Sequence, residues 1–140
     1  MTTEELLALS DAKGFIEVPA ELCGLEAASV LLPSGNCAWT VDGRNLTEAE
    51  YRWRVSHEVG HCAENAFYTR NSPPAARLRA EALADRWSYR KMIPIAELLS
   101  AFADGCCEAW EIAERLNVPE QMVRKAVEYY KAAFYDRYPA

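Results

Sequence analysis

The chain has 140 residues, of which 51% are hydrophobic, and this suffices for one compact domain over residues 1–140. No apolar run approaches the roughly 18 residues that a membrane span needs, and the acidic start MTTEELLALSDAKG lacks the basic and apolar parts of a secretory signal. The net charge of −6 disfavours nucleic-acid binding, because an acidic surface repels phosphate backbones.

The cysteines agree with a cytoplasmic location, which is the default without a signal. Their number is odd and no CxxC pair occurs. A disulfide framework or a zinc site made of thiolates is therefore not expected, and we predict free, partly buried thiols. Cys62 follows His61 directly but points about 100° away from it on a helix, so we do not assign it to a metal. The five are Cys23, Cys37, Cys62, Cys106 and Cys107.

The first third of the chain predicts short elements and one hairpin. A helix over residues 3–13 is expected to stop at Gly14, before a brief strand and a single helical turn. Two runs of strand-forming residues then flank the turn PSGN (33–36), which predicts an antiparallel hairpin. The two runs are SVLLP (29–33) and NCAWTVD (36–42).

The remainder of the chain predicts five helices. The first begins at Thr47, where Thr-Glu-Ala-Glu has the capping-box pattern, and is expected to run to about Phe67. The second begins at two prolines, which suit a first helical turn, and ends before Pro94. The others are predicted over residues 95–104, 107–116 and 119–135.

Residues 57–61, His-Glu-Val-Gly-His, form an HExxH motif. On a helix, side chains four residues apart lie on one face, so His57 and His61 can bind one metal ion, which we predict to be Zn²⁺. Glu58 beside them can accept a proton from water activated by the metal. These are the only two histidines, and chance would produce this arrangement in only about 0.2% of cases. The alternative is two surface histidines on an ordinary helix.

The sides of this predicted helix differ in character. Val55, Val59 and Cys62 share an apolar stripe that lies more than 100° from the two histidines. That stripe should pack on a core while the histidines face something else. Gly60 costs about 1 kcal/mol relative to Ala inside a helix. We expect it to let another backbone approach the metal side, with a merely tolerated glycine as the alternative.

Zinc in a catalytic site needs a third protein ligand and an open fourth position. The extended motif HExxHxxGxxH is excluded, because Glu64 and Phe67 stand where it requires glycine and histidine. Glu64 is one alternative ligand. On the same straight helix, however, it would converge poorly with the histidines on one ion, and it is more simply a solvated carboxylate.

Glu81 and Asp85 on the next predicted helix are stronger candidates. They lie one turn apart on a stripe well over 120° from a stripe of arginines, so both should face inward. Inward carboxylates need partners, and a metal with its histidines would supply them. Glu81 could bind zinc, and Asp85 could accept the second ring N–H of a histidine. The alternative is that both only pair with Arg77 or Arg86.

The motifs together resemble the ImmA/IrrE family of metallo-endopeptidases. The resemblance rests on VSHEVGHCAENAFY (55–68), EALADRWSYRKMIP (81–94) and WEIAERLNVPEQMVRKAVEYY (110–130), which with the preceding strand cover most of the chain. Family members carry HExxH and then a helix of the form E-x-x-A-D/N-x-F/W that ends at a proline. The resemblance therefore implies Glu81 as the third zinc ligand.

The resemblance also implies an intracellular bacterial or phage-derived protein that acts on a helix-turn-helix transcriptional repressor. The expected fold class is α+β and mostly helical. In it, a small antiparallel sheet packs on a zincin-like HExxH helix, and C-terminal helices follow. No membrane partner is expected.

Residues 106–140 are predicted to be a C-terminal helical pair that resembles a helix-turn-helix, with Asn117 where glycine is usual. In an acidic protein we interpret this pair as a packing or substrate-docking unit, with DNA reading as the alternative. Its second helix mixes both signs of charge, with Glu120, Gln121, Arg124, Lys125 and Glu128.

The expected function is hydrolysis of a peptide bond in a repressor, which would switch on a phage, mobile-element or stress-response gene set. Glu58 would take the proton from water and pass it to the leaving amine. The substrate is expected to add as a strand to residues 37–42, and a tyrosine is a possible oxyanion donor, although the sequence does not choose among the seven. The alternative is a non-catalytic zinc module that binds a repressor or DNA. Glu58 argues against it, since a structural site needs no base.

Overall fold

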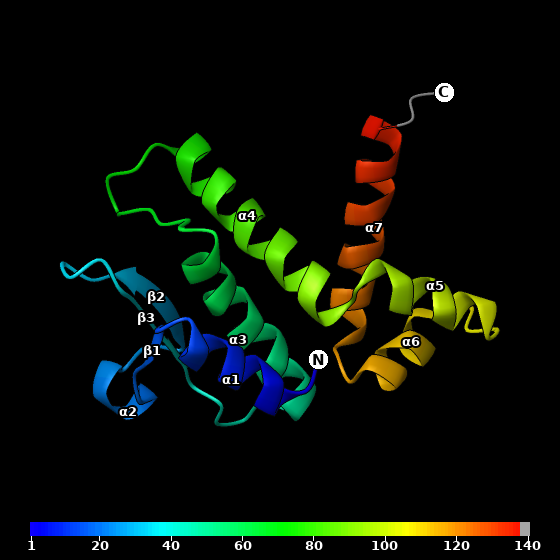
Figure 1. Cartoon of the computed structure of the whole chain (residues 1–140), viewed down its shortest axis with the longest axis horizontal. Coiled ribbons are helices and arrows are strands. Elements are labelled where there is room, and N and C mark those ends of the chain that lie inside the picture. The colour runs from blue at the N-terminus through cyan, green and yellow to red at the C-terminus, as the bar shows by residue number, and fades with distance from the viewer. Residues whose placement is uncertain (138–140) are drawn as a thin grey trace.

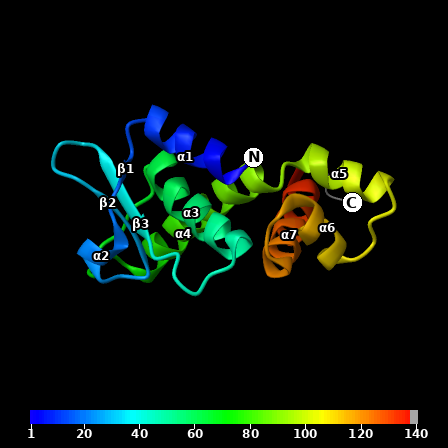
Figure 2. The same ribbon diagram turned by 90° about the horizontal axis from the view of Figure 1, so that it is seen from below.

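The computed structural model describes residues 1–137, and residues 138–140 of the predicted C-terminal pair lie outside the described residues. The mostly helical α+β fold expected from the sequence is confirmed. In chain order the elements are α1 (Thr3–Ala12), β1 (Ile16–Glu17), α2 (Ala20–Cys23), β2 (Ala27–Leu31), β3 (Cys37–Val41), α3 (Glu48–Ala63), α4 (Pro74–Met92), α5 (Ile95–Ala103), α6 (Ala109–Leu116) and α7 (Glu120–Arg137). The sheet lies at one end with α1 to α3, and α5 to α7 lie at the other, with α4 running between them (Figures 1 and 2).

The sheet has three strands in the order β1-β3-β2. The predicted hairpin is confirmed, with β2 antiparallel to β3 and Ser29 opposite Trp39. The expectation of a purely antiparallel sheet is wrong, because β1 pairs in parallel with the other edge of β3. Strands β1 and β2 are joined through α2 and pair with opposite edges of β3. Strand β3 is therefore central, and it cannot accept a substrate strand as residues 37–42 were expected to do.

Helix α3 has the predicted start but an earlier end. The side chain of Thr47 accepts from the backbone N–H of Glu50, and the Glu50 carboxylate accepts from the Thr47 N–H, which completes the capping box. The helix stops at Ala63 rather than at Phe67. Asn65 takes the left-handed conformation with φ of 50° and reverses the chain, which is the helix-ending role that asparagine shares with glycine.

Helices α3 and α4 pack closely where Gly60 stands. A Cβ built on Gly60 would lie 2.7 Å from the carbonyl oxygen of Ala84, well inside contact distance. The prediction that Gly60 admits another backbone is confirmed. Next to this contact, the buried hydroxyls of Ser56 and Ser88 hydrogen-bond to each other across the same two helices. The close approach brings the inward carboxylates of α4 to the histidine side of α3.

The core lies between the sheet and α3, where Trp39, Val55 and Val59 are almost fully buried. The prediction of five free thiols is wrong for two cysteines. Cys37 of β3 and Cys62 of α3 form a disulfide with a Cα–Cα distance of 5.6 Å. The other three cysteines are free. The sequence offered no spacing signal for this pair, because the folding of β3 onto α3 brings together residues that are 25 positions apart.

The C-terminal helices are joined to α3 through a buried arginine. The guanidinium of Arg52 donates to the backbone carbonyls of Leu116, Asn117 and Met1. Asn117 has φ of 53° and ends α6 in the left-handed conformation, in the position where glycine is usual. On α7, the ammonium group of Lys125 lies 5.8 Å from the ring centroid of Trp53 on α3. One side of the second helix of the pair therefore faces the body of the protein.

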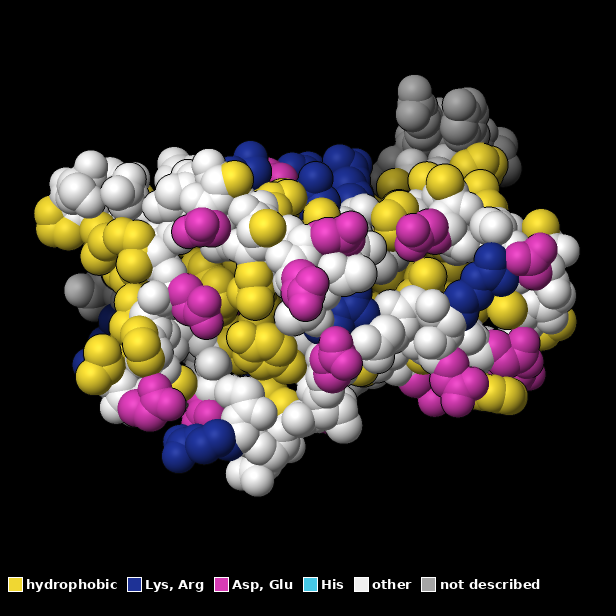
Figure 3. All heavy atoms as spheres, turned by 60° about the horizontal axis from the view of Figure 1, so that its bottom comes forward, with side chains coloured by type: hydrophobic (Ala, Val, Ile, Leu, Met, Phe, Trp, Pro, Cys, Tyr) yellow, Lys and Arg dark blue, Asp and Glu magenta, His cyan; other side chains and the backbone are white. Residues whose placement is uncertain are grey.

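The surface reflects the acidic composition. On the face shown in Figure 3, Asp and Glu side chains are spread from the sheet end to the C-terminal helices, and Lys and Arg lie among them without forming one continuous basic area. This agrees with the net charge of −6. None of the helices in residues 1–137 is long and apolar enough to cross a membrane.

Candidate metal centre

Two helices contribute the candidate site. Helix α3 supplies His57, Glu58 and His61 from one side, and α4 supplies Glu81 and Asp85 from the other. Nε2 of His57 lies 3.2 Å from Nε2 of His61 and 2.8 Å from Oε2 of Glu81. Nε2 of His61 lies 3.5 Å from Oε1 of Glu81. The structure thus brings together the three side chains that the sequence suggested as metal ligands, and their donor atoms lie within 4.8 Å of one another.

Hydrogen bonds orient both imidazole rings toward this point. Nδ1 of His57 lies 2.9 Å from Oδ1 of Asp85, and Nδ1 of His61 lies 2.6 Å from the carbonyl oxygen of Ala66. Both partners are acceptors, so both rings carry a proton on Nδ1. In the neutral rings the Nε2 atoms then carry the lone pairs, and these atoms face each other and Glu81. Such outer contacts on the second ring nitrogen are usual for metal-binding histidines.

The donor set can be compared with the dimensions of a metal site. With metal–ligand distances near 2.05 Å, two ligands of a tetrahedral site stand about 3.3 Å apart. The two Nε2 atoms are 3.2 Å apart, and each lies near a different oxygen of Glu81, at 2.8 Å from Oε2 for His57 and at 3.5 Å from Oε1 for His61. These separations lie on both sides of that value. Two imidazole lone pairs and a carboxylate in such proximity repel one another unless a cation lies between them. The residues present therefore fit a divalent metal.

The charges around the histidines also favour a cation. Burial by itself would lower the pKa of His57, but the hydrogen bond with Asp85 and the nearby carboxylates outweigh it and raise that pKa above its ordinary value. Three carboxylates surround the two imidazoles, those of Glu58, Glu81 and Asp85. A proton and a metal would therefore compete for the same negative site.

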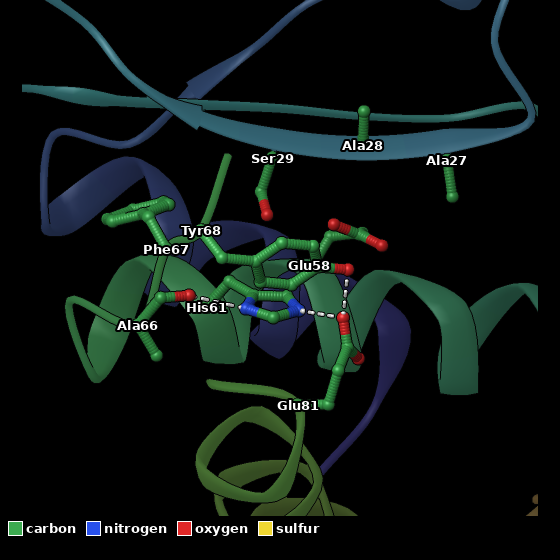
Figure 4. A pocket seen from close by; sticks show the side chains of 9 residues that line it. All are labelled: Ala27, Ala28, Ser29, Glu58, His61, Ala66, Phe67, Tyr68 and Glu81. Atoms are coloured by element: carbon green, nitrogen blue, oxygen red, sulfur yellow. Dashed lines mark hydrogen bonds and ion pairs between the residues drawn. The ribbon is translucent and has the colours of Figure 1, made fainter. Parts of the chain in front are cut away.

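Glu58 points into the space beside the candidate ligands. Its side chain lines two adjoining cavities, one shared with His61, Phe67 and Tyr68, and the other with His57 and Trp53 among others. It is largely buried, and Figure 4 shows it between His61 and strand β2. The HExxH glutamate thus lines the same space as the two histidines and Glu81.

Strand β2 borders this space with an edge that no other described strand pairs. The N–H of Asp42 donates to the carbonyl of Glu26, so the even-numbered positions of β2 bond to β3 in the antiparallel ladder. The backbone groups of Ala27 and Ser29 are therefore directed outward. Figure 4 shows the side chains of these two residues pointing toward the cavity, while Ala28 points away. An extended peptide could pair along this edge.

The alternatives to Glu81 are engaged elsewhere. Glu64, the other candidate ligand, accepts a 3.1 Å hydrogen bond from Arg86. Arg86 is therefore paired with Glu64 rather than with the inward carboxylates of α4. Arg77, the second arginine considered as a partner, lies over the ring of Tyr68, with its guanidinium carbon 5.2 Å from the centroid.

Two contacts at the site were not expected from the sequence. The carbonyl of Ala66 reaches His61 because Asn65 turns the chain back. An asparagine just beyond a helix is a sequence feature that could have predicted this reversal. The hydroxyl of Tyr68 donates a 2.6 Å hydrogen bond to Glu81. That hydrogen bond, together with partial burial, raises the pKa of Tyr68 above its ordinary value. The residues around Tyr68 in the sequence do not distinguish it from the other six of the seven tyrosines.

Comparison of the chain with protein-family models, with curated proteins and with solved structures gave no match.

Proposed function

We propose that this protein is a zinc-dependent endopeptidase. The observation that carries the proposal is the convergence of Nε2 of His57, Nε2 of His61 and the Glu81 carboxylate, with Glu58 lining both adjoining cavities beside them. A structural zinc site is usually closed by four protein ligands, whereas three ligands with an adjacent carboxylate are typical of hydrolytic zinc sites. The proposed arrangement, an HExxH helix beneath the edge strand of a sheet, is zincin-like.

Each residue of the site has its own role in the proposed reaction. Bound Zn²⁺ would supply a Lewis acid that polarises the scissile carbonyl and lowers the pKa of the attacking water. Glu58 accepts the proton of that water and later delivers it to the leaving amine. Asp85 holds the Nδ1 proton of His57 and so keeps Nε2 available as a ligand. The outward backbone groups of Ala27 and Ser29 hold the substrate in an extended conformation.

The proposed substrate is a helix-turn-helix transcriptional repressor, and its cleavage would switch on a phage, mobile-element or stress-response gene set. This part of the proposal rests on the resemblance of the motifs to the ImmA/IrrE family. From the same resemblance we propose an intracellular, bacterial or phage-derived protein; the Cys37–Cys62 disulfide means that the cysteines no longer support this location.

The test is cleavage of a purified helix-turn-helix repressor, chosen from the genes that neighbour this chain's own gene, followed by intact-mass spectrometry. The zinc-loaded protein is expected to cut the repressor, and Glu58→Gln is expected to retain zinc and fold but lose cleavage, because the amide cannot act as a base. Glu64→Gln is the matched control, since Glu64 pairs with Arg86 and should be dispensable. Cleavage by Glu58→Gln at the wild-type rate would refute the mechanism. A repressor that is bound but never cut would favour the non-catalytic module.

A further inference from the structure

Tyr68 contacts the candidate site without being one of its three ligands. It lies in the loop between α3 and α4, and its hydroxyl donates to Oε1 of Glu81 at 2.6 Å. The other oxygen of Glu81, Oε2, lies 2.8 Å from Nε2 of His57. The two oxygens of one carboxylate thus have different nearest partners, a phenol for Oε1 and a ligand imidazole for Oε2.

The ring of Tyr68 is held from both helices. On α4, the guanidinium carbon of Arg77 lies 5.2 Å from the ring centroid, one turn before Glu81. On the α3 side, the ring of His61 meets it edge-on at a centroid distance of 6.4 Å. Figure 4 shows the hydroxyl directed at the carboxylate of Glu81. The hydrogen bond is therefore part of a framework of three contacts rather than an isolated one.

A carboxylate can bind zinc through one oxygen or through both. Binding through both would fill the coordination position that a hydrolytic site must leave open. A hydrogen bond from a neutral hydroxyl to an ionised carboxylate is short and strong, and it holds the acceptor oxygen in place. Oε1 also lies 3.5 Å from Nε2 of His61, so both oxygens of Glu81 are near the metal position. Because the hydrogen bond from Tyr68 occupies Oε1, Oε2 is the oxygen that is favoured to bind the metal.

We propose that Tyr68 is a positioning residue that confines Glu81 to one-oxygen coordination of the metal and so keeps the fourth position open. The inference rests on the proposed metal centre and adds a residue to it. It predicts that removing one hydroxyl changes the coordination of the metal without changing any ligand.

The experiment compares wild type with Tyr68→Phe, which keeps the aromatic ring and its contact with Arg77. Each protein is loaded with Co²⁺ in place of Zn²⁺, and the visible absorption is recorded. Four-coordinate Co²⁺ absorbs much more strongly than five-coordinate Co²⁺, so the band of Tyr68→Phe should be weaker. Zinc affinity, measured by competition with a chromophoric chelator, should fall roughly 10–100-fold, the usual effect of losing an outer hydrogen bond to a metal ligand.

Tyr51→Phe is the matched control. Its ring faces Gly43, and it lines neither cavity beside the histidines, so spectrum and affinity should stay at wild-type values. Circular dichroism verifies that both variants are folded. If wild type binds no Co²⁺, the metal centre itself is refuted. If wild type binds Co²⁺ and Tyr68→Phe gives the same spectrum and the same zinc dissociation constant, the role of Tyr68 is refuted while the metal centre stands.

Discussion

Substitution of Gly60 by alanine tests whether the close contact of α3 with α4 assembles the site. The new Cβ would stand 2.7 Å from the carbonyl oxygen of Ala84 and 3.3 Å from its Cα. Ordinary contact distances begin near 3.4 Å, and the obstacle is backbone rather than a flexible side chain. The helices must therefore separate by about 0.7 Å, from 2.7 to 3.4 Å, to restore contact distance.

The consequence for stability is a balance of two terms. Alanine favours a helix over glycine by about 1 kcal/mol, and overpacking of a close contact costs about 1–3 kcal/mol. We expect the metal-free Gly60→Ala protein to lose roughly 0–2 kcal/mol in free energy of unfolding. Urea unfolding in the presence of a chelator measures this quantity.

The consequence for the metal should be larger, because Ala84 lies between Glu81 and Asp85. A separation of about 0.7 Å would stretch the contacts of His57 with both carboxylates, now 2.8 and 2.9 Å, beyond good hydrogen-bonding distance. We expect zinc affinity to fall roughly 10–100-fold, as it does when outer-shell partners are disturbed. Chelator competition measures the change.

The control is Gly43→Ala. Its Cβ would also be crowded, at 3.2 Å, but by the side chain of Tyr51 and outside both cavities beside the histidines. Zinc affinity should be unchanged in this variant. A Gly60→Ala protein that gains about 1 kcal/mol of stability and binds zinc like wild type would refute the reasoning. The helices would then not be held at the distance that the site requires.

Further outcomes follow from the same contacts. Asp85→Asn should weaken zinc binding roughly 10–100-fold, and Glu81→Gln should weaken it more, because an amide is a poor zinc ligand. If a chelator titration gave the reverse order, Asp85 would be the metal ligand and Glu81 the outer hydrogen-bond partner. In the metal-free protein the pKa of His57 is raised above 6.5, so its stabilising contribution is fully present below pH 6.5 and is lost as the pH rises through the raised pKa. Urea unfolding on both sides of that pKa should show this loss in wild type and much less of it in Asp85→Asn. Reduction of the Cys37–Cys62 disulfide, whose sequence separation is 25, should lower the free energy of unfolding by about 3 kcal/mol. Equal unfolding midpoints with and without dithiothreitol would show that the pair does not stabilise the fold.

The features that could be predicted from the sequence are local. The spacing of His57 and His61 predicts that both side chains lie on one face, because one turn of helix places residues four apart on the same side. The capping box at Thr47 and the turn between β2 and β3 likewise depend on bonds within a few residues. The inward placement of Glu81 and Asp85 followed from the same periodicity within α4.

The earlier end of α3 was also encoded locally, and the left-handed Asn65 is the residue responsible. Asparagine is a weaker signal than glycine for such an ending, so the helix was predicted four residues too long. That difference matters for the site, because the reversal at Asn65 brings the carbonyl of Ala66 to His61 and allows Tyr68 to return toward α4.

Which segments meet was decided by tertiary packing. Three features have no corresponding periodic pattern in the sequence. They are the pairing of Cys37 with Cys62, the parallel alignment of β1 with β3, and the position of Tyr68, rather than one of six other tyrosines, at the site. Each depends on the path of a loop and on the distance at which two elements pack. Periodicity shows which side of a helix carries the chemistry, because helical hydrogen bonds repeat every few residues. Only the packed structure shows what that side faces, because contacts between distant segments depend on the shape of the whole core.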